Sequence, residues 1–143
     1  MQEHEAEFRQ RDIREERFQR LRSERREVYA RVLDGVEEFI AALRDLRDTE
    51  LPDDLPVSSS YEVKAAHPIA ARALLSMEKQ RRLDSDVILV ADHEVRDNVL
   101  LLSQLLRSAF KAAVGNRGDL APVHEQYKVV LHAMRLELVG PSQ

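Results

Sequence analysis

Within the first 48 residues, apolar side chains recur at helical spacing from Phe18 onward, and neither proline nor glycine occurs before Gly35. Such spacing places them on one face of a helix, so it predicts a single long helix. At about 100° per residue, one broad sector holds Phe18, Leu21, Val28, Tyr29, Val32, Val36, Phe39, Ile40, Leu43 and Leu46. Phe8 and Ile13 fall well outside this sector. The helix is therefore expected to have a packed C-terminal part and a projecting N-terminal part.

The projecting part is highly charged but balanced. Residues 1–27 hold eight arginines and eight acidic side chains. Three pairs place a glutamate four residues before an arginine: Glu5 with Arg9, Glu7 with Arg11, and Glu16 with Arg20. Each such pair stabilises a helix by roughly 0.2–0.5 kcal/mol. This segment can therefore be helical without burying much apolar surface.

A loop and a second helix follow. Residues 49–60 combine acids, prolines and three consecutive serines, a composition typical of a loop. Ser59 and Glu62 have the spacing of a capping box. A helix is predicted from Pro68 to about Val90, and its inner face is expected to consist of Ile69, Ala73, Leu74, Met77 and Val87.

Two further helices are predicted after it. Asp92 is expected to cap the third, and Gly115 and Asn116 suit its exit. Its apolar face consists of Val95, Val99, Leu102, Leu106, Phe110 and Ala113. Asp119 is expected to cap the fourth, which ends at Gly140. Its inner residues are Leu120, Val123, Tyr127, Val130, Leu131, Met134 and Leu138.

These elements predict an all-α protein, an elongated four-helix bundle whose long N-terminal helix extends beyond the bundle. A chain of 143 residues with 43% hydrophobic composition suits one core. At 1.5 Å per residue the first helix would be about 70 Å long and the others roughly 30–35 Å. The expected division is therefore a charged helical extension over residues 1–27, continuous with a bundle domain over residues 28–143.

Composition removes several functional classes. The chain has no cysteine, which excludes disulfides, thiolate catalysis and cysteine-ligated metals. Its four glycines form neither a P-loop nor a dinucleotide fingerprint. The longest apolar runs are far shorter than the roughly 20 residues that span a bilayer, and no signal-peptide pattern opens the chain. A cytoplasmic protein without a cofactor is the simplest expectation.

Metal-binding and catalytic patterns are weak. His93, Glu94 and Asp97 resemble the start of an HExxH zinc helix, but an aspartate stands where the second histidine belongs. His124 begins a similar pattern that reaches Lys128, which cannot be a ligand. Solvated polar residues near helix starts explain both patterns, so no metal site is predicted. An enzyme with a site built from His93, Glu94, Asp97 and His124 remains a competing hypothesis.

The arginines of the first helix raise a second alternative. Arg11, Arg14, Arg22 and Arg25 share one sector, with Glu7 among them. Phosphate binding requires a net positive stripe, whereas the chain carries a formal charge of −4. A nucleic-acid or membrane-surface accessory factor that uses this Arg-rich segment is therefore the alternative function.

Three stretches carry a family resemblance: the run RLRSERREVYARVL over residues 20–33, the junction VILVADHEVRDNV, and the ending at residues 134–138. This layout resembles uncharacterised helical-bundle proteins of high-GC bacteria, and eighteen arginines against four lysines fit such a genome. That family has no assigned activity. The resemblance implies the bundle fold and a membrane-proximal setting, and it transfers no site residues.

The leading hypothesis is a non-enzymatic interaction or scaffold protein that self-associates through its long helix. The partner would be a second copy, forming a homodimer or a larger homo-oligomer, or another helical protein. The proposed contact region consists of Phe18, Leu21, Arg25, Val28 and Tyr29, where the apolar stripe begins.

Overall fold

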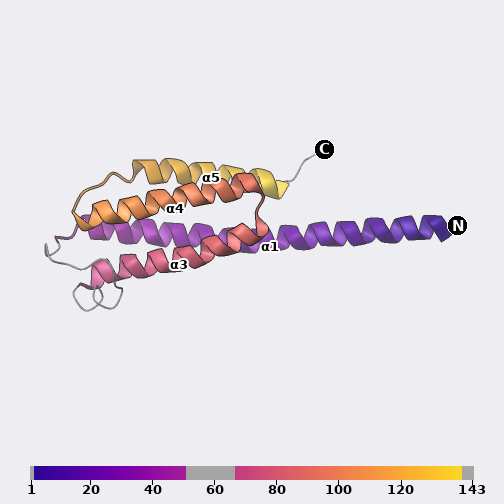
Figure 1. The fold of residues 1–143 in the computed structure, drawn as a ribbon, viewed down its shortest axis with the longest axis horizontal. Helices are drawn as coiled ribbons and strands as arrows, with labels where there is room; N and C mark the ends of the chain where they lie inside the picture. The colour runs from indigo at the N-terminus through magenta and orange to yellow at the C-terminus, as the bar shows by residue number, and fades with distance from the viewer. Residues whose placement is uncertain (1, 51–66, 140–143) are drawn as a thin grey trace.

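The computed structural model describes residues 2–50 and 67–139, with side chains from Glu5 onward. Four helices form in these residues: α1 (Gln2–Arg47), α3 (Pro68–Val90), α4 (His93–Val114) and α5 (Ala121–Val139). The described residues contain no strand. The prediction of an all-α bundle with one long N-terminal helix is confirmed (Figure 1).

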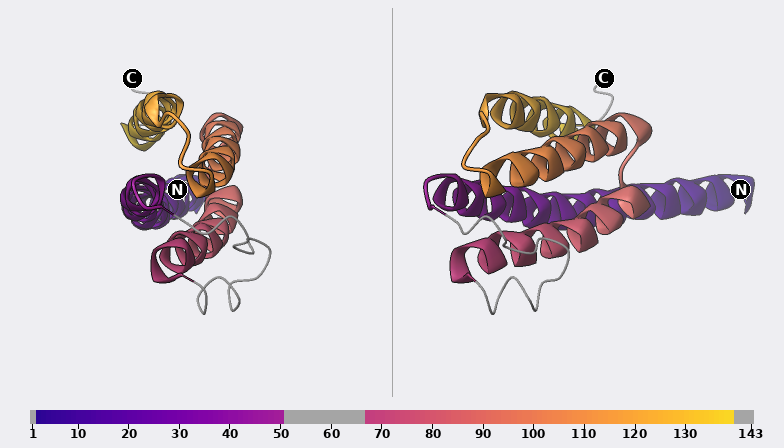
Figure 2. Two further views of the ribbon diagram at one scale, coloured as in Figure 1. Left: turned by 90° about the vertical axis from the view of Figure 1, so that its left-hand side faces the viewer. Right: turned by 60° about the vertical axis from the view of Figure 1, so that its left-hand side comes forward.

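The three shorter helices lie beside the C-terminal half of α1, and the N-terminal half of α1 projects away from them (Figure 1). Along the chain the four helices alternate in direction. Viewed from the end, they surround a common core (Figure 2). The largest contact of α1 is with α3, whereas α5 packs mainly on α4 and touches α1 sparingly.

The apolar stripe of α1 is buried from Val28 onward. Its buried members are Val28, Tyr29, Val32, Val36, Phe39, Ile40, Leu43 and Leu46. Phe18 and Leu21 belong to the same stripe, yet they are exposed because the other helices end before they reach them. The predicted division of the helix into packed and projecting parts therefore matches the structure.

The predicted inner faces of the other helices also pack in the core. Every predicted member on α4 is buried. On α3, Ala73, Leu74 and Val87 are buried, while Ile69 and Met77 are partly buried against the core. Leu120, just before α5, is buried, as are Val123, Val130 and Met134 on the helix. Tyr127 and Leu138 pack partly against the core, and Leu131 is partly exposed.

Short polar side chains define the helix ends, as expected. Asp92 separates α3 from α4, and its carboxylate accepts a hydrogen bond from the Val95 amide at 3.1 Å. Asp119 accepts from the Ala121 amide at 2.9 Å at the start of α5. The capping box at Ser59 and Glu62 and the helix end at Gly140 lie outside the described residues.

The turn after α4 is fastened to the end of α1. Asn116 adopts a left-handed conformation with φ of 58°, which asparagine tolerates better than most residues. Its side-chain amide donates to the Arg47 carbonyl at 3.0 Å and also to the Thr49 carbonyl. The end of α1 and the turn between α4 and α5 are thereby held together.

Gly35 lies in the middle of α1 for a packing reason. A Cβ atom at this position would lie 2.6 Å from Gln80 Oε1 and 2.6 Å from Leu83 Cδ1. Both contacts are far below van der Waals separation, so a larger residue here would require the ends of the Gln80 and Leu83 side chains to move. The cost of glycine in a helix, about 1 kcal/mol relative to alanine, is offset by this packing.

Candidate interaction site

The projecting part of α1, residues 2–24, is called the arm below. Every described side chain of the arm from Glu5 to Leu21 is exposed, and Arg22 is half-buried. Phe18 is 48% exposed and Leu21 is 37% exposed. These two side chains extend the stripe that forms the bundle core. The arm therefore presents apolar surface that its own chain does not cover.

The structure divides the predicted contact region. Phe18 and Leu21 are exposed on the arm, whereas Val28 and Tyr29 are buried in the bundle at 8% and 2% exposure. Placing Val28 and Tyr29 in a partner contact therefore requires correction, because an intact bundle already covers both. Arg25 lies at the boundary.

A polar cluster fastens the base of the arm to the bundle. It consists of Arg25, Tyr29, Asp92 and Glu137, and it is called the clasp below. Arg25 Nε donates to the Val90 carbonyl at 2.6 Å and lies 2.9 Å from Glu137 Oε1. The Tyr29 hydroxyl donates to the same carboxylate, and the Asp92 amide donates to Glu137 Oε2 at 3.3 Å. The clasp therefore joins α1, the turn between α3 and α4, and the end of α5.

Burial determines the electrostatics of the clasp. The Glu137 side chain is 5% exposed. Burial raises the pKa of Glu137, although the hydrogen bond from Tyr29 and the charge of Arg25 oppose the shift. Burial and the hydrogen bond to Glu137 raise the pKa of Tyr29, so its hydroxyl stays protonated and donates. Arg25 also satisfies a carbonyl at the C-terminal end of α3, where a cation is favourable.

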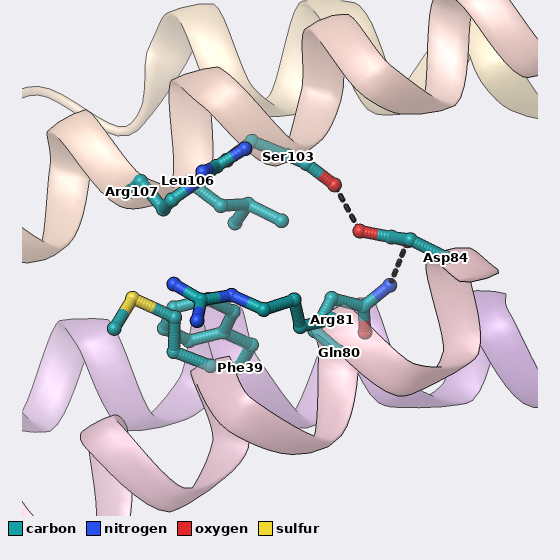
Figure 3. Close-up of a pocket in the computed structure, with 8 residues that line it drawn as sticks. Phe39, Gln80, Arg81, Asp84, Ser103, Leu106 and Arg107 are labelled. Atoms are coloured by element: carbon teal, nitrogen blue, oxygen red, sulfur yellow. Dashed lines mark hydrogen bonds between the residues drawn. The ribbon is translucent and has the colours of Figure 1, made fainter.

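A second buried polar cluster lies between α3 and α4 (Figure 3). Asp84 Oδ1 accepts from Gln80 Nε2 at 3.0 Å, and Asp84 Oδ2 accepts from the Ser103 hydroxyl. Burial raises the pKa of Asp84, while its two hydrogen bonds and Arg107 oppose the shift. The network links the two helices at one fixed register.

The cavity beside Asp84 is too small for a substrate. Phe39, Leu106, Arg81 and Arg107 are among its lining residues, and its volume is about 20 Å³. This volume accommodates about one water molecule, whereas pockets for drug-sized ligands have volumes of about 300–1,000 Å³. The Asp84 cluster is therefore best explained as a structural network.

Polar pairs also connect α5 to α1 along their length. The Tyr127 hydroxyl donates to Glu37 Oε1 at 3.1 Å, and Arg44 lies 3.4 Å from His124 Nε2. Burial and the neighbouring Glu37 raise the pKa of Tyr127 to about 12. Together with the clasp, these pairs hold α5 beside α1, where direct contact is sparse.

The structure does not assemble the alternative enzyme site. His93, Glu94 and Asp97 are exposed at the start of α4, whereas His124 lies at the start of α5, at the opposite end of the bundle (Figure 1). Asp97 is 3.8 Å from its neighbour Arg96. Among the described residues, no group of three histidines or acids is placed to hold a metal ion. The hypothesis of a joint site for these residues is wrong.

The sequence did not reveal the clasp. Glu137 adjoins the predicted inner residue Leu138, and only its burial shows that it faces inward. Tyr29 lies 108 residues away in the chain, so no local spacing connects the two. The Asp84 cluster had a weak signal in the sequence, because its member Ser103 interrupts the apolar face of α4 between Leu102 and Leu106.

In the part of the chain that the structure describes, no helix combines the length and apolar character needed to cross a bilayer. No protein-family model matches the sequence, and searches of curated proteins and solved structures likewise found no match. The arm and the clasp are therefore the features from which function must be inferred.

Proposed function

We propose that this chain is a non-enzymatic interaction protein that self-associates through the arm. The observation that carries the proposal is the continuity of one stripe. From Val28 onward the stripe is the bundle core, and beyond the bundle it continues as exposed Phe18 and Leu21. Fully burying a large apolar side chain is worth about 1.5–3 kcal/mol, so covering this extension is favourable.

The arm also gains from a partner in a second way. Its side chains are exposed along most of its length, and in proteins most helical stability comes from tertiary packing. Packing against another helix would stabilise the arm. The clasp supports this role because it fixes the base of the arm, and a preorganised surface loses less entropy on binding.

Sedimentation equilibrium over a concentration series tests the proposal. The parent chain is expected to form a reversible homodimer, and Phe18→Ala is expected to shift it towards monomer. Leu101→Ala is the matched control, because Leu101 is 44% exposed in the middle of α4, away from the arm. A parent chain that remains monomeric at every soluble concentration would contradict the proposal.

A further inference from the structure

The buried part of α1 follows a strict heptad repeat. Six of its core residues are separated by alternating steps of three and four, and none is more than 2% exposed: Tyr29, Val32, Val36, Phe39, Leu43 and Leu46. Alternating steps of three and four average 3.5 residues, which is the repeat of a left-handed coiled coil. In this half of the helix, α3, α4 and α5 provide the packing partners.

The same alternation continues along the arm without a break. Counting back from Tyr29 reaches Arg25 in the clasp and then Arg22, Phe18, Glu15, Arg11 and Phe8. The last five residues are called the seam below. Phe8 lies off the stripe of a straight helix, because such a helix drifts by about 20° per heptad from this repeat. Supercoiling removes the drift and brings Phe8 into line with Phe18.

From Phe8 to Phe18 the seam is exposed and has a palindromic order of chemistry. Phe8 is 65% exposed and Phe18 is 48% exposed, and the charged residues Arg11 and Glu15 lie between them. Read from either end, the order is an aromatic residue, two opposite charges, and an aromatic residue. A surface of this kind is complementary to itself when one copy is reversed.

We propose that the seam binds the arm of a second copy of this chain, which runs antiparallel to it. The inference rests on the proposed self-association and specifies its geometry. Full overlap of two arms places residue 2 of one copy beside residue 24 of the other, so each arm ends at the other bundle. In that register Phe8 faces Phe18 of the second copy, and Arg11 faces its Glu15.

Charge distinguishes this arrangement from a parallel one. In a parallel pair in register, Arg11, Glu15 and Arg22 would each face the same residue of the other copy, giving three layers of like charge. The antiparallel register instead forms two Arg11 to Glu15 pairs between two aromatic layers. Asp12 and Arg14 lie on either side of the two-fold axis that relates the two copies, so each faces the same residue of the other copy. Both are exposed, and solvent screens the repulsion between such charges. Charge complementarity therefore selects the antiparallel pair.

The buried area indicates a reversible dimer. About half of each phenylalanine surface is still exposed, so the four in a dimer supply roughly 400 Å². A small stable interface buries about 1,200 Å² in total. Leu21 and the aliphatic stems of the arginines on the arm must supply the remainder. Dimerisation is therefore expected to depend on protein concentration.

A charge-swap series tests the register by sedimentation equilibrium. Arg11→Glu places two glutamates opposite each other twice per dimer, and Glu15→Arg does the same with arginines. Each single change is expected to weaken the dimer at least about tenfold, or about 1.4 kcal/mol. The double variant R11E/E15R restores both pairs only in the antiparallel register, so its affinity should return to within about threefold of the parent. Far-UV circular dichroism controls for loss of helix.

Disulfide trapping tests the direction independently. Since the chain lacks cysteine, Arg11→Cys and Glu15→Cys chains can be mixed and oxidised without competing thiols. Antiparallel arms should give mainly the mixed 11-to-15 disulfide. Disulfides mainly between identical variants, together with single charge variants that dimerise as tightly as the parent, would overturn the antiparallel seam and leave self-association standing. A monomeric parent would overturn both.

Discussion

Replacing Glu137 should separate the hydrogen bonds of the clasp from its charge. The Glu137 carboxylate accepts from the Tyr29 hydroxyl and the Asp92 amide, and it lies 2.9 Å from Arg25 Nε. In Glu137→Ala all three donors lose this acceptor. In Glu137→Gln the amide oxygen can still accept from Tyr29 and Arg25. The two variants therefore share the loss of charge and differ in hydrogen bonding.

The expected magnitudes follow from burial. Tyr29 is 2% exposed, and a buried donor left without an acceptor costs about 1–3 kcal/mol. The Arg25 side chain is 22% exposed, so partial solvation limits its loss to about 1 kcal/mol. Glu137→Ala is therefore expected to lower the free energy of unfolding by about 2–4 kcal/mol.

Glu137→Gln is expected to be mild. Because burial raises the pKa of Glu137, the folded protein holds the neutral carboxyl more readily than the unfolded chain does. A neutral amide of the same shape keeps an acceptor for Tyr29, and the charge that it removes faces the partly solvated Arg25, so the free energy of unfolding should fall by only about 1 kcal/mol. Urea unfolding at pH 7, followed by far-UV circular dichroism, measures both variants. If Glu137→Gln were as damaging as Glu137→Ala, the charge would be the stabilising element and this reasoning would fail.

Two further predictions concern the bundle. Burial raises the pKa of Asp84 in the folded protein above its value in the unfolded chain, which is about 3.9. The carboxyl therefore contributes most to stability below that unfolded value, and this contribution is lost as the pH rises through the folded pKa. Asp84→Asn should therefore stabilise the protein at pH 7 in urea unfolding and flatten its pH dependence; a destabilised variant at pH 7 would contradict this. Gly35→Ala should lower the free energy of unfolding by about 1 kcal/mol. Overpacking against Gln80 and Leu83 costs about 1–3 kcal/mol and outweighs a gain of about 1 kcal/mol in helix propensity. A raised midpoint of thermal unfolding would show that α3 moves to accommodate the alanine at little cost, and it would contradict this prediction.

Local patterns in the sequence were sufficient for most of the fold. The bounds of α3 were predicted at Pro68 and Val90, because a proline at the first turn and a break at Asp92 are local signals. Every apolar core residue of α4 was predicted, since its 3.6-residue periodicity is a property of the helix alone, whereas the burial of Ser103 was not predicted. Long-range contacts had no such signal, and the clasp is the clearest example.

A bundle domain was predicted from residue 28, but which residues of the stripe remain available to a partner was not readable from the sequence. The stripe through Phe18, Leu21, Val28 and Tyr29 looks uniform, because helical spacing records which residues share a face and not which of them are covered. Only the lengths and positions of α3, α4 and α5 decide that Val28 is buried while Leu21 is exposed. The contact region predicted for a partner therefore extended too far into the bundle.

Hydrogen exchange of the arm at low and high protein concentration tests the central claim most directly. In a monomer the side chains from Glu5 to Leu21 are exposed, so the backbone amides of this segment should exchange rapidly. At high concentration these amides should become protected, while protection in α4 remains constant. Exchange in the arm that is independent of concentration, or new protection on α4 instead, would contradict self-association through the arm.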